Sequence, residues 1–424
     1  MQDKEFLRKA REEKCTQKEL KEFLMKRFSL SEQQYDLVCN YLEKRKVEAK
    51  EEESFGVVFA ITQYCNLNCA HCAANAKLVR EKNIPFELTT EQVFLIIDKI
   101  KDYIAETGFK LFFDFGGGEP TLRPDLEEIL KYAARELGAQ NISLSTNGTV
   151  LRAEDFISIG KYVGVIETSL DGFEKEHNSL RDPNKVTTIN NPFAKTYNFI
   201  STILRSPLRD KLQVASVILR RNVRSLPLLA KHLRELGLKN YYILRRAMPI
   251  GRMLAHKEEI LNIAEYFHLF LQVAEIKKED PNFKIRLHHS LESIYSALFL
   301  GEDIYETTLP MGSGKHSIGI DWNGFVYFDP WGMVPPYTLL RSGNLLVRNT
   351  TLRDLMDDPQ SILNLAGEIV KKNVRCKQCK MRCTGGMRFN AISHFISRYD
   401  IKSVTKSHLI AGFTEIDPAC PLYE

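Results

Sequence analysis

Short apolar runs alternate with stretches of helical period from residue 57 to about residue 275. A short apolar run, such as residues 57–61, is typical of a strand that is buried on both faces. Strand-then-helix units in series predict parallel strands joined by right-handed crossovers. The pattern is compatible with a doubly wound sheet and with a partial or full barrel. The expected strands are Val57–Ile61, Lys110–Phe115, Asn141–Ser145, Val163–Leu170, Leu212–Leu219 and Tyr241–Leu244.

The two ends of the chain follow other patterns. Residues 1–53 are rich in Lys, Glu and Leu, and no Gly or Pro occurs in them. They predict a helical extension, which either packs on the main domain or docks a partner or substrate. Beyond residue 285, apolar runs flank Asn323-Gly324, a strong hairpin signal. We therefore expect three units: residues 1–53, a core at 54–285 and a smaller domain at 286–424.

Composition narrows the class of protein. Of 424 residues, 44% are hydrophobic and 27% charged, which excludes a disordered tail, a collagen and a disulfide-rich mini-protein. The net charge of +5 is too small to indicate a nucleic-acid partner. No apolar run reaches the roughly 18 residues needed to span a membrane, and the first residues lack the apolar core of a signal peptide. A cytoplasmic protein is expected, and in that compartment nine cysteines favour metal or redox chemistry over disulfides.

Three of the cysteines lie close together after the first strand. Cys65, Cys69 and Cys72 have the spacing C-x3-C-x2-C. A loop at the carboxyl end of a strand is where α/β proteins bind ligands. Three neighbouring thiolates repel one another unless a cation holds them, and three ligands leave a fourth position open. An iron–sulfur cluster with one iron not bound by protein fits this arrangement, and so does an open zinc site.

The segment CNLNCAHC (residues 65–72) resembles the cluster loop of radical S-adenosylmethionine (SAM) enzymes. The resemblance implies a partial (β/α)6 TIM barrel that binds SAM and a [4Fe–4S] cluster. It also implies reductive cleavage of SAM to a 5′-deoxyadenosyl radical, which abstracts hydrogen from a substrate. Five further motifs follow in the family's order: Gly117–Pro120 (GGEP), Ser145–Gly148 (STNG), Ser169–Gly172 (SLDG), His177–Arg181 (HNSLR) and Pro249–Arg252 (PIGR).

Residues in these motifs are candidates for the SAM site. Glycines allow a backbone to approach a small charged ligand, and Glu119 can accept hydrogen bonds from an ammonium group. Small polar side chains at strand ends can bind a ribose or a carboxylate. The resemblance places His71 beside the adenine and Arg181 on the SAM carboxylate; core packing and a surface arginine are the plainer alternatives. The candidates are His71, Gly117, Gly118, Glu119, Ser145, Asn147, Ser169, Arg181 and Leu219.

A second set of cysteines stands near the C-terminus. Cys376, Cys379, Cys383 and Cys420 form C-x2-C-x3-C and a distant fourth residue. Four thiolates complete a closed site, which on spacing alone suits structural zinc. The set resembles the auxiliary-cluster domain of the SPASM subgroup of radical SAM enzymes. The resemblance therefore favours one auxiliary [4Fe–4S] cluster over zinc.

The chain departs from that subgroup at the other auxiliary cluster. A full SPASM domain carries two, but Met311 and Asp329 stand at about the places where ligands of the cluster nearer the substrate are expected. The later cysteine run is also shorter and lacks the extra Cys. We expect this cluster to be absent and the domain to be twitch-like. Asp329 is then a candidate general base at the substrate cavity, or an exposed turn residue.

HNSLR after SLDG, together with PIGR, resembles the peptide-modifying branch of the family. The expected substrate is a ribosomally made precursor peptide, which would be crosslinked, epimerised or excised. Residues 1–53 contain no complete winged helix, which leaves room for a separate peptide-recognition protein, and a flavodoxin or ferredoxin would supply electrons. Two alternatives stay open: radical modification of a small molecule or cofactor precursor, and a non-catalytic iron–sulfur scaffold or electron-transfer subunit.

Overall fold

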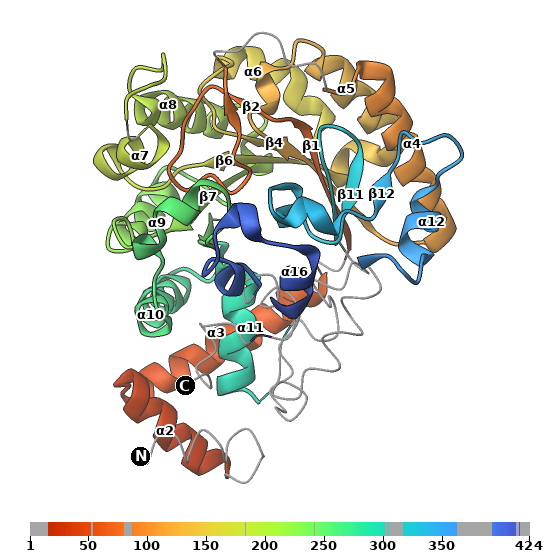
Figure 1. Cartoon of the computed structure of the whole chain (residues 1–424). Coiled ribbons are helices and arrows are strands. Elements are labelled where there is room, and N and C mark those ends of the chain that lie inside the picture. The colour runs from red at the N-terminus through yellow and green to blue at the C-terminus, as the bar shows by residue number, and fades with distance from the viewer. Residues whose placement is uncertain are drawn as a thin grey trace.

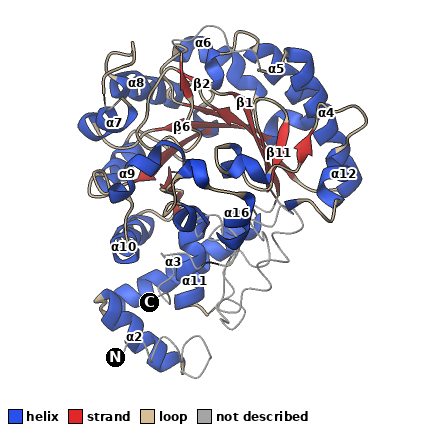
Figure 2. Ribbon diagram, in the orientation of Figure 1, coloured by secondary structure: helices blue, strands red, loops and turns tan. Residues whose placement is uncertain are grey.

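A long, mostly parallel sheet runs through the molecule, and helices surround it (Figures 1 and 2). The computed structural model describes residues 16–51, 54–79, 87–182, 184–240, 242–301, 304, 317–362, 392–412 and 415. Within these residues the strand order is β12-β11-β10-β1-β4-β5-β6-β7-β8-β9. The strands are β1 (Phe55–Thr62), β4 (Leu111–Gly117), β5 (Ile142–Thr146), β6 (Val165–Ser169), β7 (Leu212–Ile218), β8 (Tyr242–Arg246), β9 (Ile285–Leu287), β10 (Ser317–Ile320), β11 (Phe325–Tyr327) and β12 (Gly343–Asn344).

The predicted α/β class is confirmed, and so are all six predicted strands. They form the parallel ladder β1-β4-β5-β6-β7-β8, in the order in which they follow one another along the chain. Their helix-facing side chains are apolar and fully buried, for example Phe59 and Phe113. The described sheet does not close on itself, because β9 and β12 are its two edges. This is the arrangement of a partial barrel.

Helices join the strands and cover the outer face of the sheet (Figure 2). Several begin with a capping box, in which a side chain and a backbone N–H at the helix start satisfy each other. The helices are α2 (Gln17–Phe28), α3 (Glu32–Glu51), α4 (Thr90–Thr107), α5 (Leu126–Ala133), α6 (Ala153–Ile159), α7 (Glu174–Arg181), α8 (Pro192–Leu204), α9 (Leu226–Glu235), α10 (Ile263–Glu279), α11 (His289–Phe299), α12 (Leu352–Asp357) and α16 (Lys406–Gly412). None of the helices in the described ranges is long and apolar enough to cross a membrane.

The predicted hairpin after residue 285 is present. Strands β10 and β11 pair antiparallel, and Asp321 organises the turn by accepting hydrogen bonds from the backbone N–H of Asn323 (2.9 Å) and Phe325 (3.0 Å). Pairing between β10 and β1, which is parallel, was not predicted. The sheet therefore continues across residue 285, and the division of the chain into three domains stays a prediction.

The N-terminal extension packs on the core through α3, which contacts α10 and α11. Arg45 and Glu292 form an ion pair (Nε–Oε2, 3.2 Å) whose side chains are only 1% and 0% exposed. Tyr41 donates a hydrogen bond from its hydroxyl to the same carboxylate (2.6 Å). A buried charge is tolerated only with such partners. Of the two roles expected for residues 1–53, packing on the core is therefore visible.

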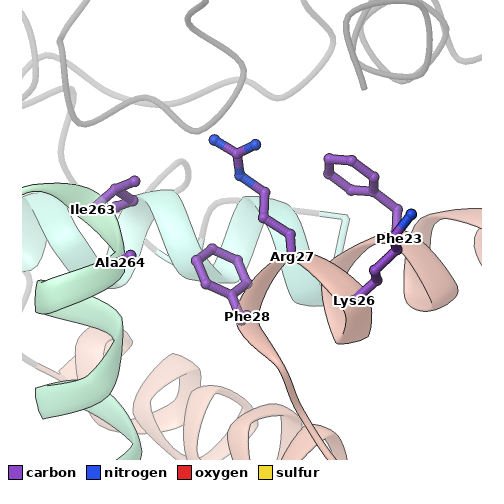
Figure 3. A pocket seen from close by; sticks show the side chains of 6 residues that line it. All are labelled: Phe23, Lys26, Arg27, Phe28, Ile263 and Ala264. Carbon is purple, nitrogen blue, oxygen red and sulfur yellow. The ribbon is translucent and has the colours of Figure 1, made fainter. Parts of the chain in front are cut away.

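A pocket of about 300 Å³ lies between α2 and the start of α10 (Figure 3). Phenylalanine side chains and the cationic side chains of Lys26 and Arg27 face it from α2. None of the sequence motifs contributes to this pocket, which separates it from the candidate chemistry. Its lining residues are Phe23, Lys26, Arg27, Phe28, Ile263 and Ala264.

We predict that Arg45→Ala lowers the free energy of unfolding by about 3–5 kcal/mol, because it leaves the Glu292 carboxylate buried without its guanidinium partner. The measurement is urea denaturation of the two proteins. Lys18→Ala is the control, since the Lys18 side chain is 86% exposed. Equal stability of Arg45→Ala and the control would contradict the docking role of α3.

Candidate functional site

The three predicted cysteine ligands share one loop. Strand β1 ends at Thr62, and the short strand β2 (Tyr64–Cys65) pairs in parallel with β3 (Lys77–Leu78), which closes the base of the loop. Cys65 is 8% exposed and Cys69 is 6% exposed, while Cys72 is half-buried. All three are free thiols. The loop thus gathers three buried or half-buried sulfur atoms beside the carboxyl end of β1.

Every one of these sulfurs accepts at least one N–H hydrogen bond. Such donors stabilise a thiolate relative to a thiol. The loop therefore offers each sulfur a donor of the kind that a metal-bound thiolate accepts. The donors are Leu67 N (3.4 Å) and Asn147 Nδ2 (3.8 Å) for Cys65, Arg181 Nη1 (3.8 Å) for Cys69, and Ala76 N (3.5 Å) for Cys72.

Burial works against these thiolates. It raises the pKa of the Cys65 thiol well above its usual value, and it raises the pKa of Cys69 to about 11 although Arg181 lowers it. A bound metal is the ordinary way to keep such sulfurs deprotonated. In the described ranges, no three His, Cys, Asp or Glu side chains are placed to hold one ion. Three thiolates are the ligands that a [4Fe–4S] cluster with one open iron takes, each thiolate binding its own iron.

The Pro249–Arg252 motif clamps the cysteine loop from β8. Arg252 donates from Nε to the Cys69 carbonyl and from Nη1 to the Ala76 carbonyl, both at 2.7 Å. Its backbone N–H donates to the Cys72 carbonyl (3.0 Å). Gly251 has φ +54°, and a Cβ there would stand 2.4 Å from the same carbonyl oxygen. The sequence showed this motif without its role, which is to hold the loop from Cys69 to Ala76.

Glu119 is a fully enclosed carboxylate, 1% exposed. Its Oε1 accepts from the Thr146 hydroxyl (2.7 Å) and from the hydroxyl and N–H of Thr121, and its Oε2 accepts from the backbone N–H of Asn147 (2.7 Å). Burial raises the pKa of Glu119, while these donors oppose the rise. No basic side chain in the described residues forms an ion pair with it. The site is suited to an incoming ammonium group.

Gly117 and Gly118 serve a close contact between chain segments. The N–H of Gly118 donates to the Thr62 carbonyl (2.8 Å), and the N–H of Glu119 donates to the Tyr64 carbonyl (2.6 Å). A Cβ on Gly118 would lie 1.9 Å from the Tyr64 oxygen, and Gly117 has φ +113°. The glycines thus let the Glu119 turn dock on the cysteine loop, and their predicted contact with SAM stays a prediction.

Asp171 joins the cysteine loop to the neighbouring strands. Its Oδ2 accepts from Arg181 Nε (2.6 Å) and lies 3.2 Å from Nε2 of His71, and its Oδ1 accepts from the Val217 N–H (2.8 Å). Burial alone would raise the pKa of Asp171, but Arg181 and His71 hold it well below its usual range. The sequence contained Asp171 in the SLDG motif, yet only Ser169 was selected there.

A comparison with known families now decides the identity of this fold. Residues 59–200, which carry the second half of β1, the cysteine loop, Glu119 and Asp171, match the model of the Radical SAM superfamily. This region of the chain belongs to the radical SAM superfamily. Membership implies S-adenosylmethionine and a [4Fe–4S] cluster as cofactors, in agreement with the prediction from the sequence.

Three relatives of this radical SAM protein illustrate the range of similar sequences. The Fe-coproporphyrin III synthase of Methanosarcina barkeri is 40% identical over 129 residues, 30% of this chain and only 29% of the relative. The AdoMet-dependent heme synthase of the same organism is 25% identical over 77% of this chain and 91% of the relative. The mycofactocin maturase MftC of Mycobacterium tuberculosis is 36% identical over 29% of each chain.

Solved structures share the fold of this radical SAM protein. The anSMEcpe protein with bound AdoMet has a TM-score of 0.59 at 18% identity, and the match covers 87% of this chain and 94% of that one. SuiB of Streptococcus suis bound to the precursor peptide SuiA has a TM-score of 0.57 at 16% identity, with 80% and 73% covered. These likenesses extend the shared fold beyond residues 59–200.

The other predicted SAM residues of this radical SAM protein lie around the same strand ends. Asn147 donates to Asn66 Oδ1 (2.9 Å) as well as to Cys65, so it bridges β5 and the cysteine loop. Ser145 instead donates to Asp114 (3.0 Å), inside the sheet. Ser169 is half-buried at the end of β6, and Leu219 is fully buried. SAM contacts of these residues stay predictions.

Asp329 is not an exposed turn residue, which was one of its two expected settings. It is 8% exposed and caps the turn Pro330–Met333, where its Oδ1 accepts from the Trp331 N–H (2.9 Å). Burial raises the pKa of Asp329 to about 7. This carboxyl can exchange a proton near neutral pH, which a general base requires. Its role as a general base stays a prediction.

Cys376, Cys379, Cys383, Cys420 and Met311 lie outside the described residues.

Polar side chains line the inner face of the sheet. In β6 burial alternates strictly, so that Glu167 keeps accessible surface while its neighbours on the helix side do not. Arg245 Nη2 bonds both Glu167 oxygens at 2.5 Å, and Gln213 donates to the same carboxylate (2.7 Å). Burial, together with the charge of Glu167, raises the pKa of Asp114 to about 7. Charged groups in a barrel interior are typical of a ligand site, and they were missed because no motif contains them.

We predict that Gly118→Ala disrupts the Glu119 turn, because its Cβ meets the Tyr64 backbone and the two segments must separate. Overpacking of this kind costs about 1–3 kcal/mol. Melting temperature and iron content after anaerobic reconstitution are the measurements, and both should fall. Gly116→Ala is the matched control, since the nearest atom to its Cβ lies at 3.4 Å. Similar behaviour of the two variants would refute this reason for the glycine.

Proposed function

We propose that this chain cleaves SAM reductively and abstracts a hydrogen atom from a ribosomally made precursor peptide. The observation that carries the proposal is the pairing of two features at adjacent strand ends. One is the loop of three N–H-bonded sulfurs, Cys65, Cys69 and Cys72. The other is Glu119, a buried carboxylate with no basic partner in the described residues.

Each part of the site has a role in this proposal. The three sulfurs would hold the cluster and leave one iron without a protein ligand. Glu119 would accept hydrogen bonds from the amino group of SAM, and Arg252 keeps the loop in place. When bound, the reduced cluster and SAM supply the electron transfer and the 5′-deoxyadenosyl radical. The enclosed setting keeps water away from reactive species.

A peptide substrate is supported by similarity to MftC, which is named a maturase, and by the shared fold with SuiB, which was solved with its precursor peptide. The polar, accessible face around Glu167 and Arg245 offers hydrogen-bonding groups to such a substrate. The chemical outcome would be a crosslink, an epimerisation or an excision.

The second candidate function is radical modification of a small molecule. Two relatives from Methanosarcina barkeri favour it, because they are named as synthases of tetrapyrroles: Fe-coproporphyrin III synthase and AdoMet-dependent heme synthase. A third possibility of another class is a scaffold or electron-transfer subunit. The intact cysteine trio and Glu119 argue against a scaffold, since a binding subunit has no use for an open iron site.

The auxiliary site is proposed from the sequence. Cys376, Cys379, Cys383 and Cys420 would hold one further [4Fe–4S] cluster, with zinc as the alternative. We also propose Asp329 as a general base, a flavodoxin or ferredoxin as the reductant and the cytoplasm as the compartment. The division into an extension, a radical SAM core and a SPASM/twitch-like domain belongs to the same proposal.

We predict that Cys69→Ala abolishes 5′-deoxyadenosine formation, because the cluster loses one of its three thiolates. The wild type and the variant are incubated anaerobically with SAM and dithionite, and the nucleoside is quantified by chromatography. Cys39→Ala is the matched control, since Cys39 lies in α3 away from the loop. A variant that forms as much 5′-deoxyadenosine as the wild type would contradict the cluster assignment. A wild type that forms none would favour the scaffold.

The substrate class is tested in the same reaction. A purified leader-bearing precursor peptide is added in one arm and coproporphyrin in another, and the masses of both are followed. A mass change of the peptide that requires SAM supports the first function. An unchanged peptide beside a consumed tetrapyrrole would replace it with the second.

We predict that Cys379→Ala lowers the iron content by about one [4Fe–4S] cluster per chain while the SAM-binding cluster remains. Iron and acid-labile sulfide are measured after anaerobic reconstitution. Unchanged iron with lost zinc would assign a zinc site instead, and unchanged metal of both kinds would remove the auxiliary site from the proposal.

A further inference from the structure

Arg181 makes two directed contacts from one guanidinium group. Its Nε donates to Asp171 Oδ2 (2.6 Å), and its Nη1 donates to the sulfur of Cys69 (3.8 Å). The side chain is 11% exposed. A planar guanidinium with two of its nitrogens engaged has little freedom to turn toward another acceptor. Both of its visible contacts serve the cysteine loop and its support, whereas the family resemblance assigned Arg181 to the SAM carboxylate.

Asp171 is itself held rigidly, which fixes the direction of the arginine. The Val217 N–H donates to its other carboxylate oxygen (2.8 Å), and the Asn222 amide donates to its backbone carbonyl (2.8 Å). Its own N–H donates to Nδ1 of His177 (3.2 Å). Because Asp171 is completely buried, moving Arg181 away would leave an ionised carboxylate short of its strongest partner. Arg181 is therefore anchored with its free end toward Cys69.

The charge of Arg181 acts on the sulfur at short range. The Arg181 guanidinium lies 3.8 Å from the Cys69 sulfur in a buried site, where charges interact more strongly than in water. A fixed positive charge favours the more negative of two states, and a reduced cluster carries one more negative charge than an oxidised one. Hydrogen bonds to the cluster sulfurs change the reduction potential in the same direction.

We propose that Arg181 is a positioning residue for the cluster: held by Asp171, it donates to the Cys69 sulfur and makes one-electron reduction of the cluster easier, whether or not SAM is bound. The inference rests on the proposed function only in requiring a cluster at Cys65, Cys69 and Cys72. The electron comes from the external reductant, and Arg181 keeps its proton throughout.

The test measures the midpoint potential of the reconstituted cluster without SAM, by a redox titration followed by electron paramagnetic resonance. Arg181→Gln removes the charge and should disfavour reduction about tenfold, which is about 59 mV for a one-electron couple. Arg181→Lys keeps the charge but cannot contact Asp171 and Cys69 together. Its midpoint potential should therefore lie between those of the wild type and Arg181→Gln. Arg152→Gln is the control, since that side chain is 78% exposed and pairs with Asp155.

The outcomes separate the inference from the proposed function. A lower potential in Arg181→Gln, with an unchanged control, supports the inference. A wild-type potential in Arg181→Gln overturns it, and a weakened SAM affinity alone would then assign Arg181 to the carboxylate. If Arg181→Gln retains no cluster, Arg181→Lys decides: a potential below that of the wild type supports the inference, and a wild-type potential overturns it. A wild type without any cluster signal defeats the proposed function itself.

Discussion

The need to keep three sulfurs negatively charged inside the protein constrains most of the site. Low-dielectric surroundings disfavour thiolates, and neighbouring thiolates repel each other. Several chain segments around the cysteine loop donate hydrogen bonds to its sulfurs or hold its backbone in place. Leu67 and Ala76 donate from the backbone, Asn147 and Arg181 donate from neighbouring elements, and Arg252 holds the carbonyls of the loop itself. The strand ends of β1, β5 and β8 are thereby tied to one another through a loop that has hardly any regular structure.

The part of the fold that the sequence predicts is the part that local patterns encode. Short segments rich in apolar residues marked the six central strands, and the cysteine spacing marked the loop. Strand β9 escaped notice because three residues carry too little pattern. The parallel pairing of β10 with β1 joins segments about 260 residues apart, which no local signal reports. Asp171 and Arg252 stood inside recognised motifs, but their roles depend on contacts between distant strands.

The glycines of the Glu119 turn show that a residue expected to contact a ligand can also be required for packing. They were read as an opening for a ligand, and the structure adds a close approach between two backbone segments. Both uses require the absence of a Cβ. The same turn therefore connects packing to chemistry, since the docking that Gly118 permits also delivers Glu119 to the edge of the cysteine loop. The inner face of the sheet had no such motif, and Glu167 and Arg245 could be found only from their shared position.

The pairing of β1 with both β4 and β10 has a consequence for dissecting the chain. The matched family region ends at residue 200, and the last predicted core element ends before residue 285. A fragment cut at that point would expose the backbone donors and acceptors of β1 that now pair with β10, over Gly56 to Phe59. Unprotected strands of this kind invite intermolecular association. The hairpin thus protects the edge of β1, the strand that leads into the cysteine loop. A fragment without the hairpin would aggregate before its chemistry could be measured.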